Sequence, residues 1–133
     1  MYCFNSDYTE GCHPAILEKL VATNMEQTTG YGMDAYCDEA RELIKKACNR
    51  PDADVHLLVG GTQTNAIVIK SLLRSYQGVV APDTAHIAVH EAGAIEMGGH
   101  KVITIKNNDG KISAKDVKNV CKGYLDDENH DHC

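Results

Sequence analysis

Short apolar runs alternate with longer helical patterns from residue 55 onward, and this alternation constrains the fold more than any other feature of the sequence. The order strand, helix, strand, helix, strand, helix is typical of a parallel sheet whose strands are joined by right-handed crossovers. We therefore predict an α/β fold, mainly a parallel sheet with flanking helices. The predicted strands are residues 55–59, 79–81 and 101–105.

Helical signals also precede the first strand. Pro14 suits the first turn of one helix, and the apolar residues that follow it share one face. Asp34 is a predicted N-cap for a second helix that runs to about Ala47. Near the other end of the chain, Ser113 with Asp116 three residues later is a capping signal for the last helix.

The segment after the second strand is predicted to begin as a loop at Pro82 and to continue as one helical stretch. Val89, Ala92 and Glu96 lie on this stretch. The pair of glycines that begins at Gly98 is predicted to end it.

The chain is predicted to have three parts: an N-terminal helical segment (1–50), a partial α/β domain (51–125) and a polar tail (126–133). Three parallel strands leave apolar edges and faces that native domains normally cover. We therefore expect the fold to be incomplete, with further protein packed against it.

Composition argues against several classes of function. The net charge of −6 disfavours nucleic acid as the main partner, because phosphate binding needs a basic face. No apolar run approaches the roughly 20 residues of a membrane span, and the N-terminus lacks the pattern of a secretory signal. The six cysteines are scattered singly, which is typical of reduced cytosolic thiols. We expect a cytoplasmic protein.

The turn from Gly60 to Thr64 joins the first predicted strand to its helix. Glycines let the backbone approach a ligand, and the free amides of a first helical turn bind anions such as phosphate. The alternative is a tight turn in which Thr62 or Thr64 is a plain N-cap. Spacing alone favours neither interpretation. The turn is neither a P-loop nor G-x-G-x-x-G, so a nucleotide is not specifically implied.

His86 follows the second predicted strand. Ligands of open parallel sheets bind outside the carboxyl ends of the strands, where the Gly61–Thr64 turn is also expected. An imidazole there could stack on a flat ring or move a proton. The alternative is an ordinary solvated histidine.

Histidine spacing is a weak metal signal in this chain. His90 lies one turn after His86, but the glutamate of H-E-x-x-H is missing between them, so packing of a helix face is the better interpretation. His130, His132 and Cys133 lie in the acidic tail, where metal binding would be adventitious. We predict no metal site.

Four short motifs occur in order along the chain. They are Phe4-Asn5-Ser6-Asp7, Gly30-Tyr31-Gly32, Gly60-Gly61-Thr62 with Asn65, and Ala85-His86-Ile87 with Glu91-Ala92-Gly93. Their order and spacing resemble the L-threonine aldolase and aromatic amino acid beta-eliminating lyase family, whose members are pyridoxal-phosphate enzymes of the aspartate aminotransferase fold (fold type I). The resemblance extends from about residue 4 to residue 105 and implies that the α/β part is the N-terminal portion of the large, cofactor-binding domain.

For the cofactor, the resemblance implies that Gly61, Thr62 and Gln63 bind the phosphate of pyridoxal 5'-phosphate. It implies that His86 stacks on the pyridine ring and helps to deprotonate the substrate hydroxyl. Glu91 matches the pattern without an assigned role. The phosphate loop has Gly-Gly-Thr where many relatives have Ser-Gly-Thr, so one hydroxyl is missing.

For the substrate, the resemblance implies that residues 1–50 line the active site. Ser6 would lie near the substrate carboxylate. Tyr31 would reach an active site, either that of its own subunit or that of a neighbouring subunit. The ring-nitrogen aspartate, the Schiff-base lysine and the arginines that hold the substrate carboxylate lie beyond this chain's end in the family. No lysine here has a matching context.

The resemblance implies cleavage of a beta-hydroxy amino acid to glycine and an aldehyde, with the chain alone inactive. We expect its partners to be the amino-acid substrate and either a second copy or the C-terminal remainder of the same enzyme. Two alternatives stay open: a beta-eliminating lyase acting on another amino acid, and a non-catalytic anion-binding α/β module.

Overall fold

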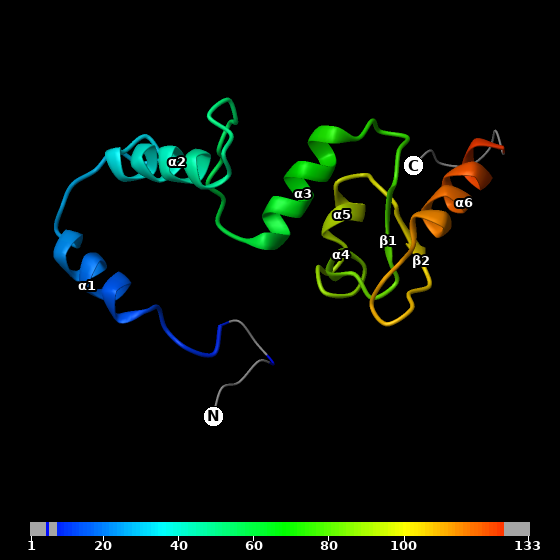
Figure 1. Cartoon of the computed structure of the whole chain (residues 1–133), viewed down its shortest axis with the longest axis horizontal. Helices are drawn as coiled ribbons and strands as arrows, with labels where there is room; N and C mark the ends of the chain where they lie inside the picture. Colours follow the sequence, from blue (N-terminus) through cyan, green and yellow to red (C-terminus); the bar gives the residue numbers. More distant parts are fainter. Residues whose placement is uncertain (1–4, 6–7, 127–133) are drawn as a thin grey trace. The chain divides into compact units, whose positions relative to one another are not determined.

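The structure is a computed structural model of the 133-residue chain, and it describes residue 5 and residues 8–126. The chain divides into two compact units, Met1–Leu57 and Leu58–Cys133. The course of the chain is drawn in Figure 1.

The first unit contains the two helices predicted for it, α1 (Pro14–Thr23) and α2 (Ala35–Ala47). In α1, Pro14 stands in the first turn and the His13 ring accepts a hydrogen bond from the amide of Ala15. In α2, Asp34 is the predicted N-cap, and its Oδ1 accepts from the Cys37 amide at 2.9 Å. The predicted capping of α2 is thereby confirmed.

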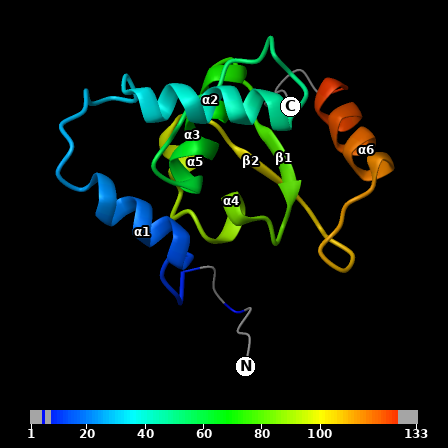
Figure 2. The same ribbon diagram turned by 60° about the vertical axis from the view of Figure 1, so that its left-hand side comes forward.

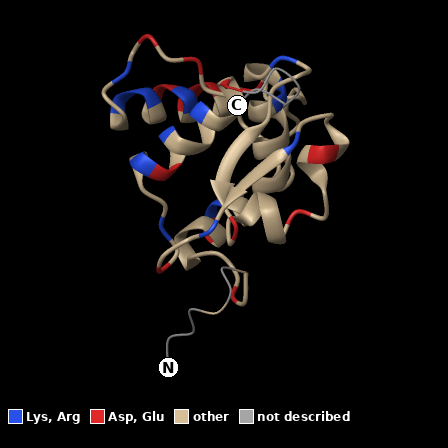
Figure 3. Cartoon of the chain, turned by 90° about the vertical axis from the view of Figure 1, so that its right-hand side faces the viewer, with Lys and Arg blue, Asp and Glu red and all other residues tan. Residues whose placement is uncertain are grey.

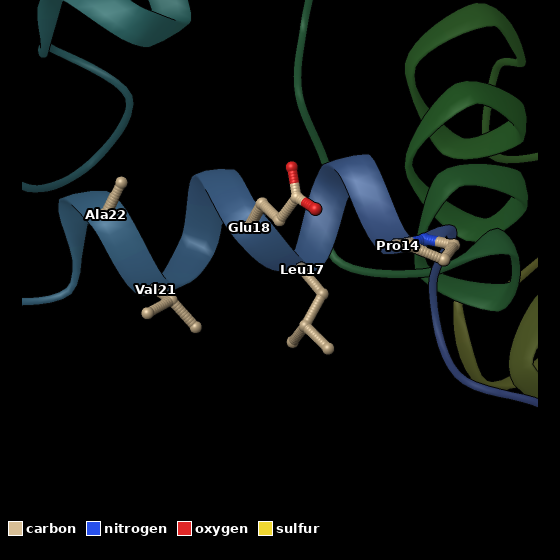
Figure 4. A pocket seen from close by; sticks show the side chains of 5 residues that line it. All are labelled: Pro14, Leu17, Glu18, Val21 and Ala22. Carbon is tan, nitrogen blue, oxygen red and sulfur yellow. The ribbon is translucent and has the colours of Figure 1, made fainter.

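The apolar face of α1 is exposed in this unit. Leu17 and Val21 extend from the same side of the helix (Figure 4) and are 55% and 71% exposed. They line a shallow hollow of about 440 Å³ together with Pro14, Glu18 and Ala22.

The second unit is built on two parallel strands, β1 (Val79–Pro82) and β2 (Val102–Ile105). Val79 pairs with Val102 and Pro82 with Ile105, so the carboxyl ends of the strands lie at the same edge. Neither strand contains a Lys, Arg, Asp or Glu (Figure 3). The predicted α/β class, with a parallel sheet and flanking helices, is confirmed.

Four helices accompany these strands. Helix α6 lies on the opposite side of the two strands from α3, α4 and α5 (Figures 1 and 2). Ser113 and Asp116 form a complete capping box at the start of α6, as predicted. The helices are α3 (Gly61–Leu72), α4 (His86–Val89), α5 (Ala94–Met97) and α6 (Ala114–Leu125).

Gly78 lets β1 begin close to β2. A Cβ at this position would lie 2.8 Å from the carbonyl oxygen of Lys101 and 2.9 Å from Cδ1 of Ile103. Ile103 and Ala81 are buried, and Ile95 of α5 is almost completely enclosed. These three side chains form the hydrophobic core of the described residues.

Two predictions about individual elements are wrong. Residues 55–59 form no strand, because in the part of the chain that the structure describes the only sheet is the β1–β2 pair and no neighbour completes a ladder with this segment. The single helical stretch expected after Pro82 is instead two short helices. Ala92 and Gly93, with φ of 50° and 76°, take the left-handed conformation that interrupts a right-handed helix.

Much apolar surface remains uncovered. Val59 is 98% exposed and Leu72 is 76% exposed, and among the described residues α1, α2, α3 and α6 contain no fully buried side chain. A finished domain buries the apolar stripe of each helix. The exposed stripes agree with the predicted incomplete fold.

Candidate cofactor site

The start of α3 presents unused backbone donors. Gly60 is its N-cap, and no side chain caps the helix, so the interpretation of Thr62 or Thr64 as a plain N-cap is wrong. The amide and the hydroxyl of Thr64 both donate to the Gly60 carbonyl oxygen, at 3.0 and 2.9 Å. Within residues 8–126 the amides of Gly61, Thr62 and Gln63 donate to no acceptor. These three amides are therefore free for an anion.

The Gln63 side chain has a local partner. Its Oε1 accepts a hydrogen bond from the amide of Val59 at 3.1 Å. This bond holds the approach of the chain to α3 and uses only the side-chain oxygen of Gln63, so its Nε2 amide and its backbone amide both stay available as donors.

His86, Glu91 and Asn65 form a hydrogen-bonded cluster beside this turn. Oε1 of Glu91 lies 2.8 Å from Nδ1 of His86 and accepts from Nδ2 of Asn65 at 2.6 Å. The Glu91 side chain is fully buried, whereas 62% of the His86 side chain is exposed. The cluster thus joins an accessible imidazole to the second turn of α3.

The surroundings of Glu91 favour the ionised form of its carboxyl group. Burial alone would raise its pKa, but the hydrogen bonds from Asn65 and His86 and the attraction of the imidazole outweigh burial and lower the pKa below its ordinary 4.5. Its second oxygen, Oε2, is buried and has no hydrogen-bond partner among the described residues.

The two strand ends are tied together next to His86. Asp83 follows β1, and its Oδ1 accepts from the backbone amide of Asn107 at 2.9 Å and from the Asn107 side chain at 2.6 Å. The side-chain bond from Asn107, then the backbone bond, lower the pKa of Asp83. This clamp fixes the loop that leads into α4.

The histidine spacing produces a ring contact. The His90 ring centroid lies 5.4 Å from that of His86, with the ring planes at 49°. In the described part of the chain, no three His, Cys, Asp or Glu side chains group together in a way that could hold a metal ion.

The proposed substrate-side residues belong to the first unit. Ser6 lies outside the described residues. Tyr31 is fully exposed, and its φ of 61° places it with Gly32 in a left-handed loop. Arg41 anchors this loop by donating from Nη2 to the Gly32 carbonyl oxygen at 2.7 Å.

The link between Asn65 and Glu91 was not predicted. Both residues occur in the sequence motifs, but the hydrogen bond between them spans 26 positions. The available signal was Glu91 itself, a charged residue within a largely apolar stretch. A carboxylate that is buried there needs hydrogen-bond partners.

Comparison with known proteins decides the family. The family model described as beta-eliminating lyase matches residues 4–130. The chain belongs to the beta-eliminating lyase family.

The chain is similar to two relatives with the curated description low specificity L-threonine aldolase. The one from Pseudomonas sp. (strain NCIMB 10558) is 29% identical over 119 residues, and the one from Pseudomonas aeruginosa is 25% identical over 119 residues. Each match covers 88% of this chain and 34% of the relative, so the chain spans about a third of their length.

A solved structure resembles this member of the beta-eliminating lyase family. It is the threonine aldolase of Leishmania major, with 43% sequence identity and a TM-score of 0.90. The match covers 95% of this chain and 36% of that one.

Among the described residues, no helix has the length and apolar character that crossing a bilayer requires.

Proposed function

We propose that this chain supplies the N-terminal part of a pyridoxal-phosphate-dependent lyase that cleaves L-threonine to glycine and acetaldehyde. The observation that carries the proposal is one arrangement: three free amides begin α3, and the same helix is bonded through Asn65 and Glu91 to an exposed His86. The names of the relatives support the substrate class.

The residues present fit the phosphate of this cofactor. Gly61, Thr62 and Gln63 would hold it with their backbone amides, and the dipole of the 12-residue α3 would add to the attraction. When bound, the cofactor supplies an electron sink for the negative charge that forms on the substrate α-carbon.

His86 would act beside the ring. Its exposed face is available for stacking, and a neutral imidazole can accept the proton of the substrate hydroxyl as the bond between the α- and β-carbons breaks. The electrons of that bond pass to the α-carbon, and the hydroxyl carbon becomes the aldehyde. We propose Ser6 and Tyr31 as contacts on the substrate side, as the family resemblance implies.

Further protein would complete the site. The amine for the Schiff base, the acid partner of the ring nitrogen and the groups that hold the substrate carboxylate would come from residues that this chain does not contain. We propose a cytoplasmic homo-oligomer. The scattered spacing of the cysteines in the sequence supports that compartment.

The family description makes elimination the second candidate function. The two reactions differ in products, since aldol cleavage releases an aldehyde and keeps the nitrogen in glycine, whereas β-elimination releases ammonia. The protein expressed from the complete coding sequence, incubated with L-threonine and pyridoxal phosphate, should form acetaldehyde and glycine in equal amounts. Formation of ammonia without aldehyde would favour elimination. If neither ammonia nor aldehyde forms, both candidate functions are contradicted.

The isolated 133-residue chain tests whether the Schiff-base lysine must come from residues outside it. Because no lysine here has the context of the Schiff-base residue, treatment with pyridoxal phosphate and borohydride should give no stoichiometric adduct at a single lysine. Mass spectrometry of the digested chain would detect one, and such an adduct together with threonine cleavage would overturn this part of the proposal.

A further inference from the structure

We propose that Glu91 is a positioning residue that keeps the ring proton of His86 on Nδ1 and leaves Nε2 as the proton acceptor. The proposal rests on the proposed function only in naming the substrate hydroxyl as the source of the proton that Nε2 receives. The protonation pattern of the ring follows from the hydrogen-bond geometry itself.

The first step concerns the shared oxygen. Oε1 of Glu91 lies 2.8 Å from Nδ1 of His86, within hydrogen-bond range. An ionised carboxylate can only accept hydrogen bonds, so Nδ1 must carry the hydrogen and donate. Asn65 donates to the same oxygen at 2.6 Å, which fixes the carboxylate in place. In the neutral ring, the remaining nitrogen is then the acceptor.

The second step concerns burial. The Glu91 side chain has no exposed surface, and a buried carboxylate is strongly disfavoured unless it is paired. Rotation of the imidazole away from Glu91 would leave this charge with Asn65 alone. The lowered pKa of Glu91 agrees with a carboxylate that stays ionised at neutral pH. The ring is therefore held in one orientation although most of its surface is accessible.

The third step concerns the link to α3. Asn65 lies on the helix whose first three amides are free, so the group that fixes Glu91 belongs to the element proposed to hold the phosphate. One helix would thus set the position of both the anion and the imidazole. Correct placement of a general base within hydrogen-bond reach is a condition for its action.

The experiment is a measurement of the His86 tautomer by nitrogen NMR. The protein from the complete coding sequence is labelled with ¹⁵N-histidine, and His86 is assigned by comparison with His86→Gln. We expect a protonated Nδ1 and an unprotonated Nε2 at neutral pH. Free ¹⁵N-histidine at the same pH is the reference for an unconstrained ring. A ring protonated on Nε2, or a mixture like that of free histidine, would overturn the proposal.

Two substitutions extend the test. Glu91→Gln keeps an oxygen acceptor and should retain the Nδ1 proton, whereas Glu91→Leu removes the acceptor and should give the mixture seen for free histidine. In the same protein, kcat for threonine cleavage should fall on the order of a hundredfold in Glu91→Leu, with a smaller effect on KM. If Glu91→Leu fails to fold, the wild-type tautomer alone decides.

Failure of the proposal and failure of the proposed function give different results. A wild-type ring protonated on Nδ1 in a protein that does not cleave threonine would support the positioning role and contradict the function. Threonine cleavage by a protein whose His86 is protonated on Nε2 would support the function and contradict the positioning role.

Discussion

Nδ2 of Asn65 donates to Oε1 of Glu91 at 2.6 Å and so bonds α3 to the segment between α4 and α5. This hydrogen bond connects parts of the chain that local sequence patterns treat as separate. It also gives a buried carboxylate one of its two partners.

Asn65→Ala should lower the free energy of unfolding. The substitution removes a hydrogen bond to a charged group, and such bonds contribute roughly 1.5–3 kcal/mol. Urea unfolding monitored by circular dichroism would measure the loss. Lys70→Ala, at an exposed position on the same helix, is the control and should change stability by at most about 0.5 kcal/mol. Equal effects of the two substitutions would contradict the structural role of the bond.

Gly61→Ala should weaken cofactor binding without loss of fold. A Cβ at this position meets no atom within 4 Å in the chain, and alanine is the better helix former. The added methyl group would instead occupy the space of a phosphate at the start of α3. Absorbance titration with pyridoxal phosphate should show a raised Kd while the Tm is not lowered. Unchanged affinity would argue against phosphate binding at this turn.

Gly78→Ala should destabilise the second unit by about 1–3 kcal/mol, because the new Cβ would lie 2.8 Å from the Lys101 carbonyl oxygen and force β1 from β2. Gly123→Ala is a matched control in α6, where a Cβ meets nothing within 4 Å. This control should raise stability by about 0.5–1 kcal/mol. Thermal unfolding of both variants would show opposite shifts, and shifts of the same sign would contradict the close packing of the strands.

Asp83 should make stability depend on pH in acid. The hydrogen bonds from Asn107 hold its pKa below the ordinary 3.8, so its contribution is present above 3.8 and is lost as the pH falls through the lowered value. The difference in unfolding free energy between wild type and Asp83→Asn should be constant well above 3.8 and shrink below it. If this difference in unfolding free energy grew as the pH falls, the predicted direction of the pH dependence would be contradicted.

Local signals in the sequence predicted the helices and their caps well. The Asp34 and Ser113 caps and Pro14 in the first turn follow from short-range patterns. The parallel pair β1–β2 follows from the alternation of strands and helices along the chain. The expected strand at residues 55–59 was wrong, because an apolar run forms a strand only where a neighbour completes its hydrogen bonds.

Other features depended on contacts that no local pattern contains. The interruption at Ala92 was missed because alanine is the best helix former, although here its φ is 50°. The partners of Glu91 lie on α3 and α4, so its role follows only from the folded chain. His86 was singled out by its place after a strand, and its role at a cofactor stays a prediction.

Cleavage of L-threonine by the protein from the complete coding sequence tests the central claim most directly. Acetaldehyde can be followed by its reduction with alcohol dehydrogenase and NADH, with and without added pyridoxal phosphate, for the wild type and for His86→Gln. We predict cofactor-dependent formation of acetaldehyde and a loss in kcat of at least about a hundredfold in His86→Gln. Cleavage that needs no pyridoxal phosphate, or a folded protein that binds the cofactor and leaves threonine intact, would contradict the account.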